Sequence, residues 1–259
     1  MQYGQPGGYE LLRNLLAQQY GVLPNQVTVS NGLLQLLDLL SAHLVTSNHR
    51  TVFSEAPTYD RALTTFRHSR GRVAGIAIEA DGLNVDVLEH RLKSTTPAFL
   101  YLIPDFQNST GITMSLAKRQ EVVKLAERHS FYITEDVPYR QLRYTGDEVP
   151  LLRELSPERV VTISSYSKLI APGLRCGYAI GPAPLIAELI ALGEQTYLSP
   201  VLVAQAAVAA FVADGHLQTQ VEWLRRLYEP RMDAMLQALK KYLPDASVTT
   251  PMGGFFIGI

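Results

Sequence analysis

Short apolar runs alternate with segments of helical periodicity over the first 180 residues, and this alternation limits the folds open to the chain. Several runs are apolar throughout, which is typical of strands buried on both faces of a sheet. Strands of this kind, separated by helices, pair mostly in parallel and are covered by helices. We therefore predict an α/β fold with a mostly parallel, seven-stranded sheet, its strands at residues 27–30, 51–56, 72–78, 98–103, 131–134, 160–164 and 176–180.

The pattern becomes mostly helical after Gly181, and a long helical stretch over residues 217–243 is expected to lead out of the sheet. Residues 247–250 and 255–259 then have the pattern of strands. We therefore predict a large domain over residues 1–225, followed at 226–259 by a linking helix and the start of a small C-terminal α+β domain. Because an unpaired apolar edge strand is a liability, the apolar run at the end of the sequence indicates a truncated chain.

The composition excludes several classes of protein. Hydrophobic residues make up 47% and charged residues 18% of the chain, and the formal net charge is −1. These values are ordinary for a globular protein and do not indicate a binder of nucleic acid or of membrane surfaces. The sequence has no run of 18 apolar residues, and its start lacks the pattern of a signal peptide. A single cysteine, Cys176, fits a reducing cytoplasm, and the histidines are not clustered as metal ligands.

Polar residues follow the predicted strands at their carboxyl ends, which is where open α/β sheets bind ligands. Lys168 lies among hydroxyl groups just after a strand, with Arg175 seven residues further on. A lysine there can form a Schiff base, and Ser165, Ser167 and Arg175 can bind a phosphate beside it. The alternative, which this segment leaves open, is a solvated serine-rich turn.

A second group consists of Asp136 at the end of an apolar strand and Tyr139 three residues later. A carboxylate there can pair with a protonated pyridine nitrogen, and the tyrosine hydroxyl can bind a phenolic oxygen on the same ring. An ordinary turn with Asp and Pro would have the same pattern.

Three weaker motifs also follow strands. The segment Asn108-Ser109-Thr110-Gly111 is either a binding loop or a plain turn. Asn31-Gly32 opens a helix whose first N–H groups can bind phosphate, although Asn31 can equally be a helix cap. Tyr59 can stack on a planar ring or pack in the core.

In combination these motifs resemble the pyridoxal-phosphate-dependent aminotransferases of fold type I, class I/II, in particular the branch of 2-aminoadipate aminotransferases and MocR-type effector domains. The resemblance rests on seven segments that span nearly the whole chain, and the Ser-x-Ser-Lys segment followed by Arg175 is the strongest. They are Tyr3-Gly4-Gln5-Pro6-Gly7-Gly8-Tyr9, Asn31-Gly32, Glu55-Ala56-Pro57-Thr58-Tyr59, Asn108-Ser109-Thr110-Gly111, Glu135-Asp136-Val137-Pro138-Tyr139, Ser165-Tyr166-Ser167-Lys168 and Ala171-Pro172-Gly173-Leu174-Arg175.

The resemblance implies a role for each matching residue. Lys168, Asp136 and Tyr139 would be catalytic: Lys168 forms a Schiff base with pyridoxal 5'-phosphate and moves the substrate proton, and Asp136 pairs with the pyridine nitrogen. Asn108 joins Tyr139 at the phenolic oxygen, and Tyr59 stacks on the ring. The phosphate would be bound by the backbone of Gly32, Leu33 and Leu34, by Ser165, Ser167 and Arg175, and by Tyr3 of a neighbouring subunit.

The resemblance thus implies a homodimer that moves an amino group between an L-amino acid and a 2-oxo acid, and the single cysteine favours a cytoplasmic location. An alternative is the effector domain of a MocR/GntR-type transcription regulator without its DNA-binding domain. A β- or γ-lyase with the same fold is a third reading, which the Asn-x-Thr-Gly and Asp-x-Pro-Tyr segments disfavour.

Two departures from the family pattern bear on the substrate. Asp105 stands where the branch often has Asn, and its negative charge is expected near the mouth of the site, where it would disfavour acidic substrates. The family's arginine for the substrate carboxylate is expected beyond Ile259. The identity of the amino donor stays open.

Overall fold

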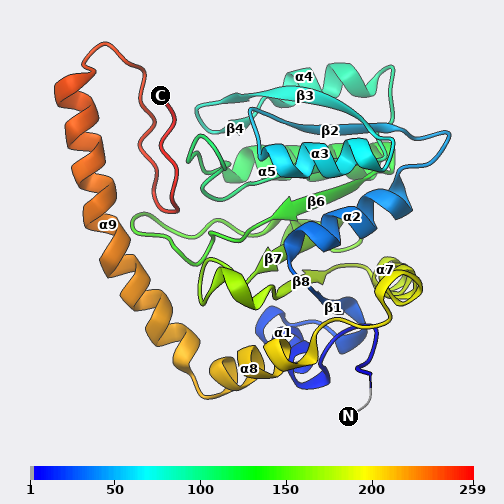
Figure 1. The fold of residues 1–259 in the computed structure, drawn as a ribbon. Coiled ribbons are helices and arrows are strands. Elements are labelled where there is room, and N and C mark those ends of the chain that lie inside the picture. The colour runs from blue at the N-terminus through cyan, green and yellow to red at the C-terminus, as the bar shows by residue number, and fades with distance from the viewer. Residues whose placement is uncertain (1–2) are drawn as a thin grey trace.

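The computed structural model describes residues 3–259, and within them a single eight-stranded sheet is flanked by helices (Figure 1). The strand order is β1-β8-β7-β6-β5-β2-β3-β4. Adjacent strands from β7 to β3 are parallel, whereas β8 is antiparallel to β7 and β1, and β4 is antiparallel to β3. The strands are β1 (Val27–Ser30), β2 (Thr51–Ala56), β3 (Arg72–Glu79), β4 (Gly82–Leu83), β5 (Phe99–Leu102), β6 (Tyr132–Asp136), β7 (Val160–Ser165) and β8 (Gly177–Ile180).

The predicted α/β fold with a mostly parallel sheet is confirmed, and the seven predicted strands are all present. The two-residue strand β4, which extends the sheet at its edge, was not predicted from the sequence. The described helices are α1 (Glu10–Tyr20), α2 (Leu33–Leu44), α3 (Asp60–His68), α4 (Val85–Leu92), α5 (Leu116–His129), α6 (Leu152–Leu155), α7 (Ala183–Tyr197), α8 (Leu202–Ala213) and α9 (His216–Tyr242).

Both faces of the sheet are buried because successive residues of a strand point to opposite sides. On the central strand β5, Phe99 and Tyr101 pack in the core formed with α2, α3 and α7. Leu100 and Leu102 pack in the core formed with α4 and α5. A third core lies between α1, α8, α9 and the strands β1 and β8. This arrangement explains why the strands are apolar throughout.

The C-terminal segment corrects one prediction. Residues 247–250 and 255–259 do not form strands; they lie in an irregular segment between α9 and the sheet (Figure 1). Their backbone bonds are isolated, such as Thr249 N to Gly258 O at 3.0 Å and Gly258 N to Thr110 O at 3.2 Å. Isolated bonds of this kind do not build the continuous ladder of a strand. The domain boundary after residue 225, which falls within α9, stays a prediction.

The polar segments of the sequence lie at the side of the sheet that is formed by the carboxyl ends of β2, β5, β6 and β7. Because these strands are parallel, the loops after them meet at one edge. No helix in residues 3–259 combines the length and apolar character that a membrane span requires.

Candidate active site

A cavity of about 240 Å³ lies at this edge of the sheet. Most of the side chains that the sequence singles out contribute to its wall, although they are spread over more than 140 residues of chain. Those that line it are Leu33, Leu34, Tyr59, Asn108, Asp136, Tyr139, Ser165, Ser167, Lys168 and Arg175. The loops after four strands and the first turn of α2 thus converge on one space.

Asp136 is the last residue of β6 and is almost fully buried. The hydroxyl of Tyr101, on the neighbouring strand β5, donates to Asp136 Oδ2 at 2.6 Å. Asp136 Oδ1 is also buried and has no hydrogen-bond partner among the described residues. Burial raises the pKa of Asp136 to about 7, and the bond from Tyr101 opposes that rise. A buried oxygen without a partner indicates a place for a ligand that can donate a proton.

Tyr139 is buried beside Asp136 at the wall of the cavity. Burial and the negative charge of Asp136 raise the pKa of Tyr139 above its ordinary value, while Asn108 lowers it. The Tyr139 ring packs edge-on against the rings of Phe255 and Phe256, with centroid distances of 5.8 and 5.4 Å. These contacts keep the phenol at one place at the cavity wall.

Lys168 lies in the turn that follows β7, where its side chain is exposed and lines the cavity. Ser165 ends β7 and is buried, and Ser167 is half-buried. The turn is closed by backbone bonds to the carbonyl of Tyr166, which accepts from Leu169 N and Ile170 N. A single short turn therefore presents an amine and two hydroxyl groups to the same space.

The first turn of α2 faces the cavity, and no side chain among residues 3–259 caps it. Asn31 does not cap it: the Asn31 Oδ1 atom accepts instead from Val201 N at 2.8 Å. The free N–H groups at this helix end therefore remain available to an anion, and the helix dipole favours negative charge there.

Arg175 lies close to the start of α2. Its backbone has a φ of 46°, a left-handed conformation that is unusual for a residue other than glycine. Gly32 does not line the cavity, but a Cβ at Gly32 would lie 2.5 Å from Arg175 Nη2. The absence of a side chain at Gly32 therefore makes room for the guanidinium.

Gly177, which the sequence analysis did not single out, makes a similar close approach. A Cβ at Gly177 would lie 2.7 Å from Leu33 N. Strand β8 can therefore pass directly behind the start of α2 only because residue 177 is glycine. The sequence signal was limited to a glycine two residues after Arg175.

Asp105 does not lie at the mouth of the cavity, where the sequence predicts it. Its side chain is 0% exposed and does not line the cavity. Its carboxylate lies 2.9 Å from Arg119 Nη2, 2.9 Å from Arg140 Nη1 and 3.4 Å from Arg143 Nη2. Three arginines thus neutralise the charge, so the expected repulsion of acidic substrates by Asp105 has no basis in this structure.

Tyr3 also lies apart from the cavity. Its side chain is 84% exposed and is absent from the cavity wall within the chain. The reach of Tyr3 to a neighbouring subunit stays a prediction.

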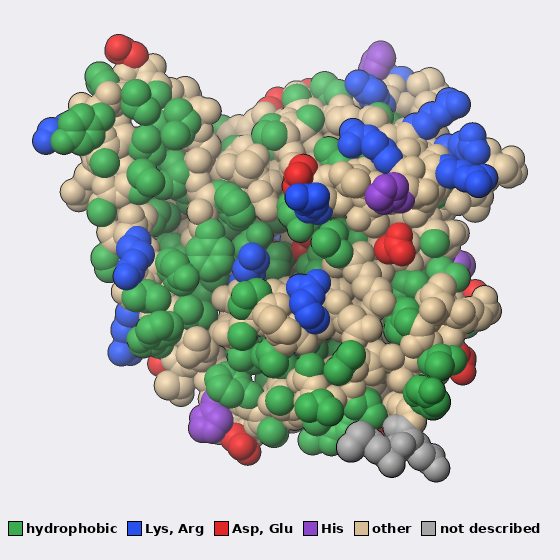
Figure 2. All heavy atoms as spheres, viewed as in Figure 1, with side chains coloured by type: hydrophobic (Ala, Val, Ile, Leu, Met, Phe, Trp, Pro, Cys, Tyr) green, Lys and Arg blue, Asp and Glu red, His purple; other side chains and the backbone are tan. Residues whose placement is uncertain are grey.

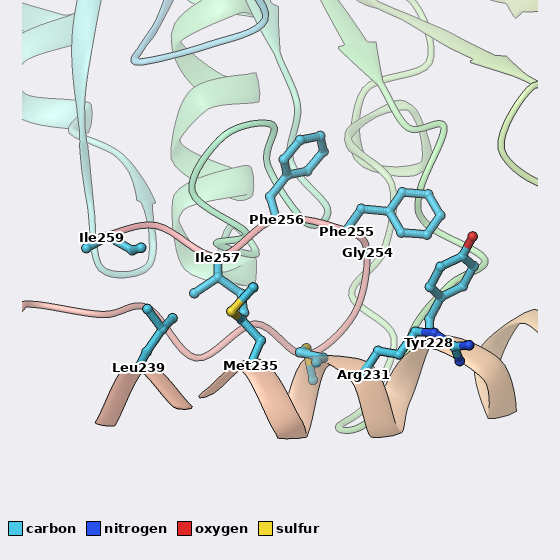
Figure 3. A pocket seen from close by; sticks show the side chains of 10 residues that line it. Tyr228, Arg231, Met235, Leu239, Gly254, Phe255, Phe256, Ile257 and Ile259 are labelled. Carbon is cyan, nitrogen blue, oxygen red and sulfur yellow. The ribbon is translucent and has the colours of Figure 1, made fainter. Parts of the chain in front are cut away.

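The structure adds Tyr101 and Phe256 to the candidate site. Tyr101 lies within an apolar strand, where its hydroxyl was the only signal of a polar contact, and Phe256 lines the cavity from the C-terminal segment. Phe256 also borders a larger cavity of about 470 Å³ between α9 and this segment, with Tyr228, Met235 and Leu239 on the helix side (Figure 3). Hydrophobic side chains are visible along this part of the surface (Figure 2). This second cavity contains none of the predicted site residues.

Known proteins match nearly the whole length of this chain. The family model "Aminotransferase class I and II" matches residues 1–258. Aromatic-amino-acid aminotransferase 1 of Thermococcus litoralis is 33% identical over 99% of this chain, which spans 64% of that protein. An uncharacterized HTH-type transcriptional regulator of Bacillus subtilis, YisV, is 30% identical over 99% of the chain, which spans 54% of the regulator.

A solved structure has the same fold. The α-aminoadipate aminotransferase LysN from Thermus thermophilus, complexed with N-(5'-phosphopyridoxyl)-L-leucine, superposes with a TM-score of 0.92 at 32% identity. The match covers 99% of this chain and 67% of that structure.

Proposed function

Because the chain belongs to the class I and II aminotransferase family, we propose that it binds pyridoxal 5'-phosphate in the cavity lined by Lys168 and Asp136. We propose that the reaction is the transfer of an amino group between an L-amino acid and a 2-oxo acid. The observation that carries the proposal is the convergence of a lysine amine, an unpartnered buried carboxylate oxygen and an uncapped helix start on one cavity.

The residues present fit this cofactor. Asp136 Oδ1 is a buried acceptor without a partner among the described residues, as a protonated pyridine nitrogen requires. The cavity wall also offers the start of α2 at Leu33 and Leu34 and the side chains of Ser167 and Arg175, which supply the N–H and guanidinium donors that a phosphate requires. Ser165 and the backbone of Gly32 complete the proposed phosphate site. Lys168 would attach the cofactor covalently.

When bound, the cofactor supplies an electron-accepting ring that stabilises negative charge at the substrate Cα. Asp136 Oδ1 would accept a hydrogen bond from the protonated ring nitrogen and so keep the ring charged. Tyr139 and Asn108 would bind the phenolic oxygen, and Tyr59 would stack on the ring. Lys168 Nζ would take the proton from the substrate Cα and return it in the later step, acting as general base and then as general acid.

We also propose that the protein is a homodimer and that it is cytoplasmic. Tyr3 is highly exposed within a single chain, which supports its assignment to the phosphate site of a second copy. Leu198 and Val201, which are also exposed and apolar, lie in the connection between α7 and α8 and would be covered in such a dimer. A single buried cysteine, Cys176, supports a reducing compartment.

A second candidate function is that of the effector domain of a transcription regulator, which the similarity to the Bacillus regulator favours. Such a domain would bind the same cofactor in the same cavity. The two functions differ in whether an amino donor converts the bound cofactor to its amine form.

The test is a titration of the purified chain with pyridoxal phosphate, followed by visible absorption, with Lys168→Ala as control. A band that depends on Lys168 and bleaches with an amino acid is expected for the aminotransferase. A stable band that no amino acid bleaches would favour the effector domain. A folded chain that gives no band would contradict both proposals. Asp136→Ala should lose most of the bleaching rate, because the ring nitrogen would lose its partner.

A further inference from the structure

The side-chain amide of Gln107 lies between two loops of the candidate site. Its Nε2 donates to the carbonyl of Pro57 at 2.9 Å and approaches Glu55 Oε2 at 3.4 Å. Its Oε1 accepts from Ser109 N at 2.8 Å, and from Thr110 N at 2.9 Å and Thr110 Oγ1 at 2.8 Å. One amide therefore links the segment after β2 to the segment after β5.

The Gln107 amide is almost completely removed from water, since the residue is 1% exposed. Both N–H donors and the carbonyl acceptor of the amide have partners in the protein. A buried polar group with all its partners satisfied holds its surroundings in one arrangement, because any displacement leaves groups unpaired at a cost. The Gln107 amide therefore holds the segments after β2 and β5 in a fixed position relative to each other.

Each of the two linked segments carries a side chain that lines the cavity. Tyr59 follows Pro57 by two residues, and Asn108 is the residue between Gln107 and Ser109. Glu55 extends the link to a third point, because its Oε2 atom also accepts from Ile103 N at 2.9 Å, and Ile103 lines the cavity as well. Gln107 itself is not part of the cavity wall.

We propose that Gln107 is a positioning residue for the cofactor: a single amide that bridges two loops would hold Tyr59 at the face of the ring and Asn108 at its phenolic oxygen. This proposal rests on the proposed function. It assigns to Gln107 an effect on cofactor affinity and on the environment of the phenolic oxygen, although the side chain touches neither.

A buried glutamine elsewhere in the chain provides a matched control. Gln205 on α8 is also 1% exposed, and its Oε1 atom accepts from Tyr9 N at 2.7 Å. It does not contribute to the cavity wall. Replacing either glutamine with methionine keeps an unbranched side chain of similar length but removes the amide. Both variants are expected to be less stable than wild type, but only Gln107→Met should bind pyridoxal phosphate more weakly.

The experiment compares wild type, Gln107→Met and Gln205→Met in the visible titration with pyridoxal phosphate and in the pH midpoint of the bound absorption band. For Gln107→Met we expect a dissociation constant at least about tenfold higher, since more than one hydrogen bond is lost, and a shifted midpoint. Gln205→Met should leave both quantities at the wild-type value. If the two variants weaken binding equally, or if neither does, Gln107 has only a structural role and the proposal fails.

Gln107→Glu serves as the second variant if Gln107→Met does not fold. It preserves the volume and an oxygen that faces Ser109 and Thr110, but an ionised carboxylate cannot donate to the Pro57 carbonyl. We expect Gln107→Glu to bind pyridoxal phosphate more weakly than wild type does, because only the bonds to Ser109 and Thr110 remain. Wild-type affinity at every pH would overturn the proposal. A wild-type chain that binds no pyridoxal phosphate would instead refute the proposed function, and with it the role of Gln107.

Discussion

The hydroxyl of Tyr101 donates to Asp136 Oδ2 over 2.6 Å inside the sheet, across the pair of parallel strands β5 and β6. This bond occupies one carboxylate oxygen and leaves Oδ1 as the free acceptor at the cavity among the residues that the structure describes. Because the bond favours the charged form of the acid, Tyr101 opposes the effect of burial on Asp136. The pair therefore orients the carboxylate and keeps it ionisable near neutral pH.

Replacing Tyr101 with phenylalanine is expected to raise the pKa of Asp136 above its value of about 7, because the favourable bond to the carboxylate is lost. The measurement is a carboxyl-carbon NMR titration of the cofactor-free chain. Tyr132→Phe, at the half-buried start of β6, is the control and should leave the titration unchanged. An Asp136 titration that does not move in Tyr101→Phe would show that the bond has no influence on the acid.

Glu55 should make the chain less stable as the pH rises. Burial raises the pKa of Glu55 to about 8 in the folded chain, above its ordinary value of 4.5, so the folded state binds the proton more tightly than the unfolded state. The stabilising contribution is present below pH 4.5 and is lost as the pH rises towards 8. Glu55→Gln does not titrate and should be stabilised relative to wild type by a few kcal/mol more at pH 8.5 than at pH 4.5.

Urea unfolding of wild type and Glu55→Gln at the two pH values measures this difference. Glu154→Gln, at a position where the side chain is exposed, is the control. Its stability should equal that of wild type at both pH values. A constant difference between Glu55→Gln and wild type would mean that the pKa of Glu55 is the same in the folded and the unfolded chain.

Gly32→Ala should weaken phosphate binding as well as stability. The backbone at Gly32 has a φ of 97°, and the new Cβ would lie 2.5 Å from Arg175 Nη2, so the guanidinium must move. We expect a loss of about 1–3 kcal/mol in stability from the backbone conformation, together with weaker binding of pyridoxal phosphate.

Gly215→Ala separates these two effects. Gly215 has a φ of 77° with open space around its Cβ position, and it starts α9 away from the cavity. Thermal unfolding should show a loss in both variants, whereas the cofactor titration should change only in Gly32→Ala. Equal cofactor affinity in the two variants would argue against a role of the Gly32 turn in binding.

Asp105→Asn should destabilise the fold without altering the site. The substitution leaves Arg119, Arg140 and Arg143 around a neutral side chain in the interior. Removing one partner of a buried ion pair lowers the free energy of unfolding by about 3–5 kcal/mol. Chemical denaturation is the measurement. Glu148→Gln, which removes only an exposed partner of Arg140, should cost about 1 kcal/mol or less.

Cofactor affinity provides a second measurement on Asp105→Asn. Because Asp105 does not line the cavity, the affinity should stay at the wild-type value wherever the variant is folded. A clear change in affinity at full folding would mean that the charge of Asp105 reaches the site through its arginines.

The class of fold and the approximate strand positions follow from the amino-acid sequence alone. Alternating apolar runs and helical periods are local properties, and burial on both faces of a parallel sheet requires them wherever the chain later lies. The motifs around Asp136 and Lys168 were visible for the same reason, since each consists of neighbours along the chain. Their meeting in one cavity followed from the parallel pairing of β5, β6 and β7.

Which side chains support those motifs depends on contacts that form only in the folded chain. The bond from Tyr101 to Asp136 crosses 35 residues, and the link from Gln107 to Pro57 crosses 50, so neither has a local signal. The sequence predicts the charge of Asp105 at the mouth of the site, yet Asp105 lies in a buried cluster of arginines. The apolar pattern after α9 predicted strands that do not form. In each case the outcome depends on which partners the folded chain brings within reach, and short-range pattern contains no information about distant partners.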